Sequence, residues 1–337
     1  MGGTLRRSSP ERRRAALLGA ALALGLADAA VAAQTIALGH QGLMRSYLVH
    51  RPPQHAPGRS LPLLIALHGT SMRAGDMFGY TDLRAVADRE GFVLAAPASH
   101  GHVFNDGFGA LGSAAAAVDD VGFIEAVAED ARTRFGVRAD GIHVVGLSNG
   151  GSMVQRLAIE SRYPFAGFAA VASAPRVRTP GVARPAPLLL VFGTADPLNP
   201  QGGGWVWTPV PHAKPSPAQT VADWAARLQC QGPPESESPL PGVQRQQWRD
   251  CSSGARLAWL SIDGLGHHWA GARPLPFPSW VVGPQLAAPK LGDLVWGFLA
   301  SASRTSSAAP AAISAVRPPA MPPAPGLAPS PDPATAK

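Results

Sequence analysis

The sequence predicts an α/β fold in which a doubly wound, mostly parallel sheet is flanked by helices. Short apolar runs alternate with helical patterns over residues 34–300. Most of these runs are apolar throughout, which is typical of parallel strands buried on both faces. Alternating strands and helices favour one sheet with helices packed against it. The expected strands are residues 61–67, 92–96, 142–145, 188–192 and 257–262.

One helix is expected at Asp120–Phe135. Its apolar residues recur at helical spacing and would share one face: Val121, Ile124, Ala128, Ala131 and Phe135. An aspartate can cap the start of such a helix, and Gly136 can end it. We therefore interpret Asp119 and Asp120 as residues of the helix start and not as a catalytic pair.

Composition and charge exclude two broad classes of protein. The 337 residues are 46% hydrophobic and 15% charged, so the chain can bury a sizeable core and is not disordered throughout. The formal charge is +7, but residues 1–33 carry a net +3 and residues 301–337 a net +2. Because the remaining body is close to neutral, a nucleic-acid partner is not expected.

Residues 1–33 have the three-part layout of a secretory signal peptide. Arginines precede an uncharged Ala/Leu stretch at residues 15–27, and small residues follow, so cleavage is expected near Ala32 or Ala33. The alternative is a membrane anchor, but Asp28 and the short apolar stretch argue against a spanning helix. We expect a secreted protein, extracellular or periplasmic, with no membrane association after cleavage.

The other end of the chain is expected to be a disordered tail. Residues 301–337 contain 9 prolines among 37 residues, together with many Ala and Ser. This composition cannot build a core and favours a disordered or polyproline-like segment. The sequence therefore predicts one catalytic domain at residues 34–300, and it contains no pattern that sets an oligomeric state.

The chain has two cysteines, Cys230 and Cys251. In an exported protein such a pair usually forms a disulfide, and the alternative is two buried free thiols. A zinc site is not expected, because two isolated cysteines lack the paired spacing of metal ligands.

A candidate nucleophile lies at Ser148. The strand expected at 142–145 leads into Gly146-Leu147-Ser148-Asn149-Gly150, a Gly-x-Ser-x-Gly pattern, and a helical pattern follows at 152–160. In this context the turn must be sharp and strained, so that the serine hydroxyl projects above the sheet. Glycines are needed on both sides because strand and helix cross closely there. A glycine-rich turn with a capping serine is the alternative.

A serine nucleophile needs a base and a carboxylate that orients the base. In this kind of fold they follow the serine in the order acid, then histidine. Asp196 comes after the strand at 188–192, and His267 comes after the strand at 257–262. Both strand ends belong to the edge of the sheet where such sites are built. His268 is the rival base and Asp263 the rival acid, although Asp263 fits a turn better.

The oxyanion of an acyl-transfer reaction needs backbone donors. One is the amide of Asn149, which follows the nucleophile. The second is expected in the loop after the first central strand, from Thr70, with Ser71 as the fallback. His68 at the start of this loop is interpreted as structural.

Several blocks of the sequence together point to a known family. They are Leu67-His68-Gly69, residues 85–97, residues 118–151, Gly193-Thr194-Ala195-Asp196-Pro197, Asn199-Pro200 with Gly202-Gly203, residues 220–230, and Gly266-His267-His268-Trp269-Ala270-Gly271. With these blocks in order, the chain resembles the secreted polyhydroxybutyrate depolymerase family of esterases, which is related to feruloyl and acetylxylan esterases of the α/β-hydrolase superfamily. The resemblance covers most of residues 45–300.

The resemblance implies a Ser148–Asp196–His267 triad, a Cys230–Cys251 disulfide and no cofactor. It also implies a short hydroxyalkanoate ester or amorphous polyhydroxybutyrate as substrate. The family usually has Thr and Pro where this chain has His268 and Ala270, and the chain departs from it again at Thr70 and Phe104. These positions surround the expected pocket and therefore bear on the substrate.

Alternatives remain at the level of function. Feruloyl or acetylxylan ester hydrolysis is the runner-up, since Trp205, Trp207 and Trp269 would offer rings for stacking on a phenolic group. Trp205 and Trp207 would pack under the following loop equally well. A serine peptidase would use the same apparatus, and a non-catalytic binding protein on a hydrolase scaffold would be expected to lack a triad member. No metal site is expected, since the histidines of Ser99-His100-Gly101-His102 fit a polar loop.

Overall fold

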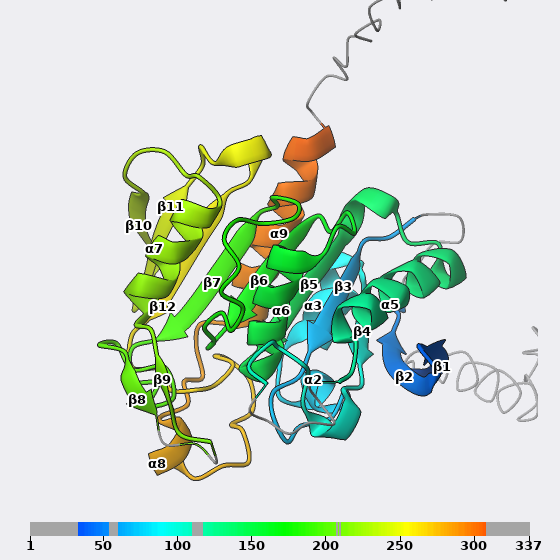
Figure 1. The fold of residues 1–337 in the computed structure, drawn as a ribbon, viewed down its shortest axis with the longest axis horizontal. Coiled ribbons are helices and arrows are strands. Elements are labelled where there is room, and N and C mark those ends of the chain that lie inside the picture. The colour runs from blue at the N-terminus through cyan, green and yellow to red at the C-terminus, as the bar shows by residue number, and fades with distance from the viewer. Residues whose placement is uncertain (1–32, 54–59, 110–116, 207, 209, 308–337) are drawn as a thin grey trace, which may run out of the picture.

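The computed structural model describes residues 33–53, 60–109, 117–206, 208 and 210–307. A ten-stranded sheet runs through it, with helices on both faces (Figure 1). The strands of this sheet are β1 (Gln34–His40), β2 (Leu43–His50), β3 (Leu63–Leu67), β4 (Val93–Pro97), β5 (Ile142–Leu147), β6 (Gly167–Val171), β7 (Leu188–Gly193), β10 (Glu235–Leu240), β11 (Val243–Trp248) and β12 (Leu257–Ile262). A small second sheet pairs β8 (Gly204–Val206) with β9 (His212–Lys214).

The helices lie between and after these strands. They are α2 (Asp76–Gly79), α3 (Leu83–Glu90), α5 (Asp120–Phe135), α6 (Asn149–Glu160), α7 (Pro217–Arg227), α8 (Ser279–Val282) and α9 (Leu291–Ser307). In Figure 1, α5, α6 and α7 lie on the near face of the sheet, while α3 and α9 lie behind it. The predicted architecture of a sheet flanked by helices is therefore confirmed.

The sheet is parallel in its centre and antiparallel at both edges. Its strand order is β1-β2-β4-β3-β5-β6-β7-β12-β11-β10. Every pair from β4 to β12 is parallel, and the outer pairs are antiparallel. The five predicted strands are β3, β4, β5, β7 and β12, with ends displaced by at most two residues. The strand that follows β3 in the chain, β4, lies on one side of it, whereas the strand that follows β5, β6, lies on the opposite side. The direction of the connections therefore reverses between the adjacent strands β3 and β5. Such a switch point opens a crevice at the carboxyl ends of the strands.

Strand β3 shows why the central strands are apolar throughout. Leu63, Ile65 and Leu67 belong to the core that also contains the buried residues of α5, α6 and α7. Leu64 and Ala66 point the other way, into the core formed with α3 and α9. Successive side chains of a strand face opposite sides of the sheet. A strand covered on both sides therefore loses the polar–apolar alternation.

Helix α5 has the predicted bounds and caps, but its buried face differs from the predicted one. The Asp119 carboxylate accepts a hydrogen bond from the Gly122 amide, and Gly136 adopts the left-handed conformation at the end. The buried apolar residues are Phe123, Ile124, Val127, Ala128 and Ala131. Val121 and Phe135 are only partly buried, because the helix docks with a stripe centred on Val127 and Ala128.

Asp120 contributes more than a helix start. Its carboxylate pairs with Arg45 Nη2 at 2.7 Å and accepts a hydrogen bond from the Asn105 amide at 2.7 Å. The side chains of Arg45 and Asp120 are both almost fully buried. A buried pair of this kind fixes the loop before α5 against the β1–β2 hairpin.

The predicted domain boundaries can be compared with the structure only in part. Helix α9 continues to Ser307, so the expected boundary at residue 300 falls inside a helix. Residues 1–32, which contain nearly all of the predicted signal peptide, and residues 308–337 of the predicted tail lie outside the described residues. Among the described residues, no helix combines the length and apolarity needed to cross a membrane.

The disulfide between Cys230 and Cys251 is present, as predicted, and the alternative of two free thiols is excluded. It joins the segment after α7 to the segment after β11. Two elements that pack at the edge of the fold are thereby linked covalently.

Candidate active site

Ser148 occupies a strained turn between β5 and α6. Its backbone has φ 57° and ψ −118°, a conformation that side-chain-bearing residues rarely adopt. A Cβ on Gly146 would collide with the Gly150 carbonyl, and a Cβ on Gly150 would collide with the Leu67 carbonyl of β3. The turn therefore tolerates only glycine at both positions. The sequence pattern had predicted this local structure from residue types alone.

His267 and Asp196 are brought together by the parallel pairing of β7 and β12. Gly193 and Ile262, the last residues of these strands, are register partners, so the following loops start side by side. His267 Nδ1 lies 2.8 Å from Asp196 Oδ2, and both residues are at most 3% exposed. The pairing selects Asp196 over Asp263, whose carboxylate is partnered by the Thr194 hydroxyl.

The Asp196 carboxylate is held by several donors. Its Oδ1 accepts from the amides of Leu198 and Asn199, and its Oδ2 accepts from the Asn199 side chain at 2.9 Å. Burial alone would raise the pKa of Asp196, but the charge and hydrogen bond of His267 and these donors hold the pKa below its ordinary value. The acid therefore stays ionised and fixes the ring of His267.

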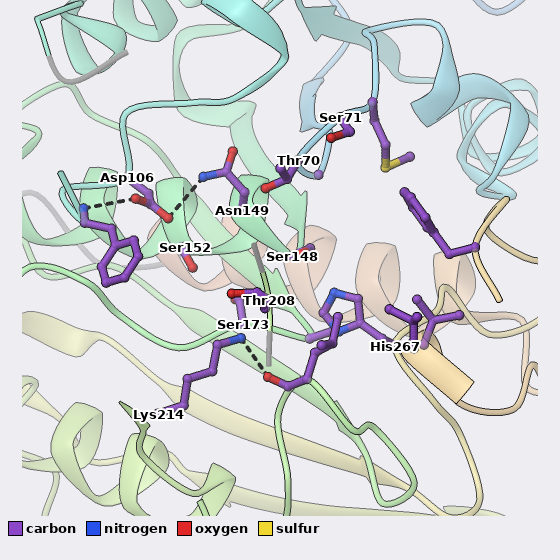
Figure 2. Close-up of a pocket in the computed structure, with 18 of the residues that line it drawn as sticks. Thr70, Ser71, Asp106, Ser148, Asn149, Ser152, Ser173, Thr208, Lys214 and His267 are labelled. Atoms are coloured by element: carbon purple, nitrogen blue, oxygen red, sulfur yellow. Dashed lines mark hydrogen bonds between the residues drawn. The ribbon is translucent and has the colours of Figure 1, made fainter. Parts of the chain in front are cut away.

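The free nitrogen of His267 faces the pocket. With Nδ1–H donated to Asp196, Nε2 carries the lone pair of the neutral ring. His267 Nε2 is buried and has no hydrogen-bond partner among the described residues. Thr70, Ser148 and His267 surround one cavity (Figure 2). The arrangement can therefore take a proton from a group in that cavity.

Backbone donors for an oxyanion lie beside Ser148. A Cβ on Gly69 would stand 3.3 Å from the Ser148 Cβ, so the loop after β3 approaches the nucleophile closely. The Ser71 amide already donates to the His102 carbonyl at 2.9 Å, which leaves Thr70 as the better candidate in this loop. His68 is buried, donates to the Gly69 carbonyl and accepts from the Ser99 amide, which is a structural role.

The Asn149 side chain anchors the other candidate donor. Its Oδ1 accepts from the Phe104 amide at 2.8 Å, and its Nδ2 donates to the Phe104 carbonyl and to Asp106 Oδ2 at 3.0 Å each. Burial is the main cause that raises the pKa of Asp106. The start of α6 is thus fixed by the loop before α5.

The cavity has a volume of about 510 Å³ and mostly apolar walls. This size is typical of small-molecule sites. Its apolar lining consists mainly of Met72, Phe108, Leu198, Val210, Leu275, Phe277, Val281 and Val282. Four ionisable side chains besides His267 also line it: Asp106, Arg176, His212 and Lys214.

Neither of the two predicted platform tryptophans that can be placed lines the cavity. Trp269 is fully buried and donates to Asp82 Oδ1 at 2.7 Å, so it packs inside the fold. Trp205 is 70% exposed and is not among the pocket-lining residues. Trp207 lies outside the described residues. Among the described residues, the phenyl rings that line the cavity are those of Phe108 and Phe277.

Sequence reasoning did not identify Asn199, Asp106, Arg176 or Lys214 as site residues. Asn199 appeared only as part of a family block, and the others lie on segments without helical or strand periodicity. For Asn199, the one usable signal was that it follows the predicted acid Asp196 by three residues. Within the described ranges, no group of three or more His, Cys, Asp or Glu side chains is arranged to hold a metal ion.

Comparison with solved structures shows the fold. An acetyl xylan esterase from Aspergillus awamori superposes with a TM-score of 0.57 at 14% identity, over 80% of this chain and 99% of that chain. A complex of pOPH with pNPB superposes with a TM-score of 0.51 at 12% identity, over 83% of this chain and 88% of that chain. At such low identity, only the architecture carries over.

Comparison of sequences shows the family. No family model matches the chain. A protein named "Putative esterase NocK" from Nocardia uniformis subsp. tsuyamanensis is 30% identical over 287 residues, which cover 77% of this chain and 79% of that protein. Because this similarity extends over three quarters of both chains, and the fold is that of the superposed acetyl xylan esterase, the chain belongs to the α/β-hydrolase family of esterases.

Proposed function

We propose that the protein hydrolyses carboxylic esters through an acyl-enzyme formed on Ser148. The observation that carries this proposal is the His267–Asp196 pair, whose free Nε2 shares a cavity with a serine on a strained turn. In the first step, Ser148 Oγ attacks the ester carbonyl while His267 Nε2 accepts its proton. His267 then returns the proton to the leaving alcohol, and a water molecule releases the acyl group by the same route.

The remaining residues stabilise charge. Asp196 holds the ring of His267 in the required tautomer and stabilises the imidazolium that forms. The backbone amides of Thr70 and Asn149 donate to the oxyanion of the tetrahedral intermediate. No cofactor enters these steps. An amine leaving group would use the same residues, but no feature of the cavity favours a peptide.

We further propose short hydroxyalkanoate esters, or amorphous polyhydroxybutyrate, as the substrate class. The family resemblance and the small, mostly apolar cavity support this choice. Feruloyl or acetylxylan ester hydrolysis is the alternative, and the acetyl xylan esterase with a similar fold is compatible with it. Of the three tryptophans on which a phenolic ester was favoured, Trp269 is buried and Trp205 does not line the cavity, which weakens the support for this alternative. Comparing kcat/KM for a hydroxybutyrate dimer with that for methyl ferulate separates the two.

Export of the protein is part of this proposal. The signal-peptide pattern of residues 1–33 supports it, and so does the Cys230–Cys251 disulfide, since disulfides persist in oxidising compartments. Sequencing of the amino terminus of the protein recovered from the culture medium or periplasm tests it. A mature chain that begins near Gln34 is expected.

The nucleophile is tested by Ser148→Ala. Ester hydrolysis should fall at least about a thousandfold while the protein stays folded, because only the attacking oxygen is lost. A fluorophosphonate probe should label the wild type and not the variant. Ser152→Ala is the matched control: Ser152 lines the same pocket, but its hydroxyl donates to the Ala174 carbonyl, so labelling should persist. Near-normal turnover by the Ser148 variant would end the mechanism, and an unlabelled wild type would favour a binding protein.

A further inference from the structure

Two cationic side chains face the cavity that contains Ser148. Arg176 comes from the segment that follows β6, and Lys214 is the last residue of β9. The mechanism proposed above uses neither of them. Lys214 lies across the cavity from the Thr70 loop in Figure 2. Because charged groups are expensive to bury, their presence in a mostly apolar cavity calls for an explanation.

Arg176 is held by uncharged rings. Its guanidinium carbon lies 4.4 Å from the centre of the Phe108 ring, and its Nη2 lies 2.8 Å from His212 Nε2. His212 Nδ1 lies 2.7 Å from the Val210 carbonyl, which can only accept, so Nδ1 carries the hydrogen. His212 Nε2 is then an acceptor for Arg176. Burial first, and then the charges of Arg176 and Lys214, lower the pKa of His212, which keeps this ring neutral.

Among the described residues, no acidic side chain forms a direct ion pair with Arg176. Asp106 is the acid that acts on it electrostatically. However, Asp106 Oδ1 accepts from the Phe108 amide at 3.1 Å and Oδ2 accepts from the Asn149 side chain at 3.0 Å. Arg176 Nε is buried and has no hydrogen-bond partner in the described part of the chain. Because Arg176 lines the cavity, an acceptor bound there would satisfy this donor.

Lys214 brings a second positive charge to the cavity, and it provides no hydrogen-bond acceptor for Arg176. Its Nζ donates to the Leu198 carbonyl at 2.7 Å and to Asn199 Oδ1 at 3.1 Å, which leaves one of its three protons for another partner. Burial, followed by the charge of Arg176, lowers the pKa of Lys214 to about 8, against the opposing effects of Asp196 and Asp106. Arg176 and Lys214 both line the same cavity. An anion bound there would relieve both.

We propose that Arg176, assisted by Lys214, binds a carboxylate of the substrate, so that the preferred ester carries a free carboxylate besides the ester group that is cleaved. A carboxylate supplies acceptors to the planar fork of a guanidinium, which matches its geometry. Phe108 packs against the guanidinium, and the apolar walls would receive the hydrocarbon part of the substrate. This inference rests on the proposed function and narrows it to monoanionic esters, a class that includes hydroxyacid oligomers with a free acid end.

The test compares esters that differ only in this charge. A hydroxybutyrate dimer and its methyl ester place the carboxylate on the alcohol side, while p-nitrophenyl hemisuccinate and p-nitrophenyl butyrate place it on the acyl side. The wild type should prefer the free acid in one of these pairs by roughly 10- to 100-fold in kcat/KM, the range expected for a hydrogen-bonded charge. Arg176→Gln should bring this ratio close to one.

Arg178→Gln is the matched control, because Arg178 is exposed and lies two residues away. It should keep the wild-type ratio, and Arg176→Lys should keep part of it. If Arg176→Gln does not fold, the wild-type ratios of kcat/KM for the free acid and the neutral ester still test the inference. Hydrolysis of the neutral esters without preference for the free acid in either pair, or the same ratio in the Arg176 and Arg178 variants, would overturn the inference alone. Hydrolysis of no ester by the wild type would instead overturn the proposed function.

Discussion

His267 and His268 are neighbours in the chain, but they contact different parts of the molecule. His267 Nδ1 is paired with Asp196, and its Nε2 lies at the cavity. His268 Nδ1 accepts from the Leu275 amide at 3.2 Å, and its Nε2 donates to the Gly283 carbonyl at 3.3 Å. The second ring therefore has both nitrogens engaged by the backbone. These bonds tie the His loop to the segments on either side of α8.

Substitution of each histidine should separate these roles. His267→Ala should lower kcat/KM at least about a thousandfold, because the base is lost, whereas His268→Ala should lower it less than about tenfold. His268→Ala should instead reduce the melting temperature, since two buried hydrogen bonds disappear. Both variants are compared by ester hydrolysis and thermal unfolding. The reverse order of activities would show that His268 is the base.

Residues of the site were predictable where a buried strand leads directly to them. Ser148, Asp196 and His267 each follow such a strand, so their types and order were sufficient. Arg176 and Lys214 were not predictable, because the segments that carry them have no periodicity that fixes their direction. Their place in the cavity, and the buried Arg176 Nε without a hydrogen-bond partner in the described part of the chain, are defined only by the folded molecule.

The same distinction holds for the secondary-structure elements. The five predicted strands lie in the covered centre of the sheet and are mostly apolar runs. The predicted set lacked β6, whose residues are Gly-Phe-Ala-Ala-Val and are mostly small, and β10, whose side chains are all exposed. Edge and small-residue strands are stabilised by pairing with their neighbours more than by their own side chains. Hydrophobic patterns in a sequence reflect the burial of side chains, but they do not show which strands pair through their backbones.

Strand β5 also contains an ionisable residue, His143, as its second residue. The ring is fully buried and packs edge-on against Trp296 at 5.8 Å between ring centres. Burial, with a smaller contribution from Arg138, lowers the pKa of His143 to about 3. The folded state therefore holds this ring neutral under conditions in which the unfolded chain protonates it.

The stability of the fold should consequently depend on pH through His143. Below the ordinary histidine pKa of about 6.5, the unfolded chain binds a proton that the folded protein excludes, so stability falls as pH decreases. Between pH 7 and pH 5 this one group should remove about 2 kcal/mol from the free energy of unfolding. Urea unfolding of His143→Leu should show a smaller loss over this range. His100→Leu, at an exposed position, should behave like the wild type, and identical pH dependence in all three proteins would contradict the assignment.

At the scale of the whole molecule, the strand order explains how distant residues meet. The switch between β3 and β5 brings the Thr70 loop beside Ser148, and the β7–β12 pairing brings Asp196 to His267, 71 residues further along the chain. Ser148, Asp196 and His267 directly follow strands of the sheet, whereas Arg176 follows β6 and Lys214 ends β9 of the small second sheet. The residues proposed to act on the ester were therefore predictable from buried strands, and the residues proposed to select the substrate were not.

The disulfide acts on the whole molecule and should affect stability without affecting the site. Cys230 and Cys251 are 21 residues apart and join the end of α7 to the end of β11, and none of the pocket-lining residues lies between them. Closing a loop of this length in the unfolded chain stabilises the fold by about 3 kcal/mol. In a domain of this size the loss corresponds to a decrease of roughly 6–12 °C in melting temperature.

Replacement of both cysteines by alanine therefore should lower the melting temperature by that amount, while kcat/KM at 25 °C stays within about twofold of the wild type. Thermal unfolding of the wild type with and without a reducing agent provides the control, because reduction should reproduce the shift without changing any other residue. The site is supported from the sheet and the β12 loop, which keep their own hydrogen bonds when α7 is released. An unchanged melting temperature would show that packing alone holds α7, and a parallel loss of activity would show that the disulfide also supports the pocket.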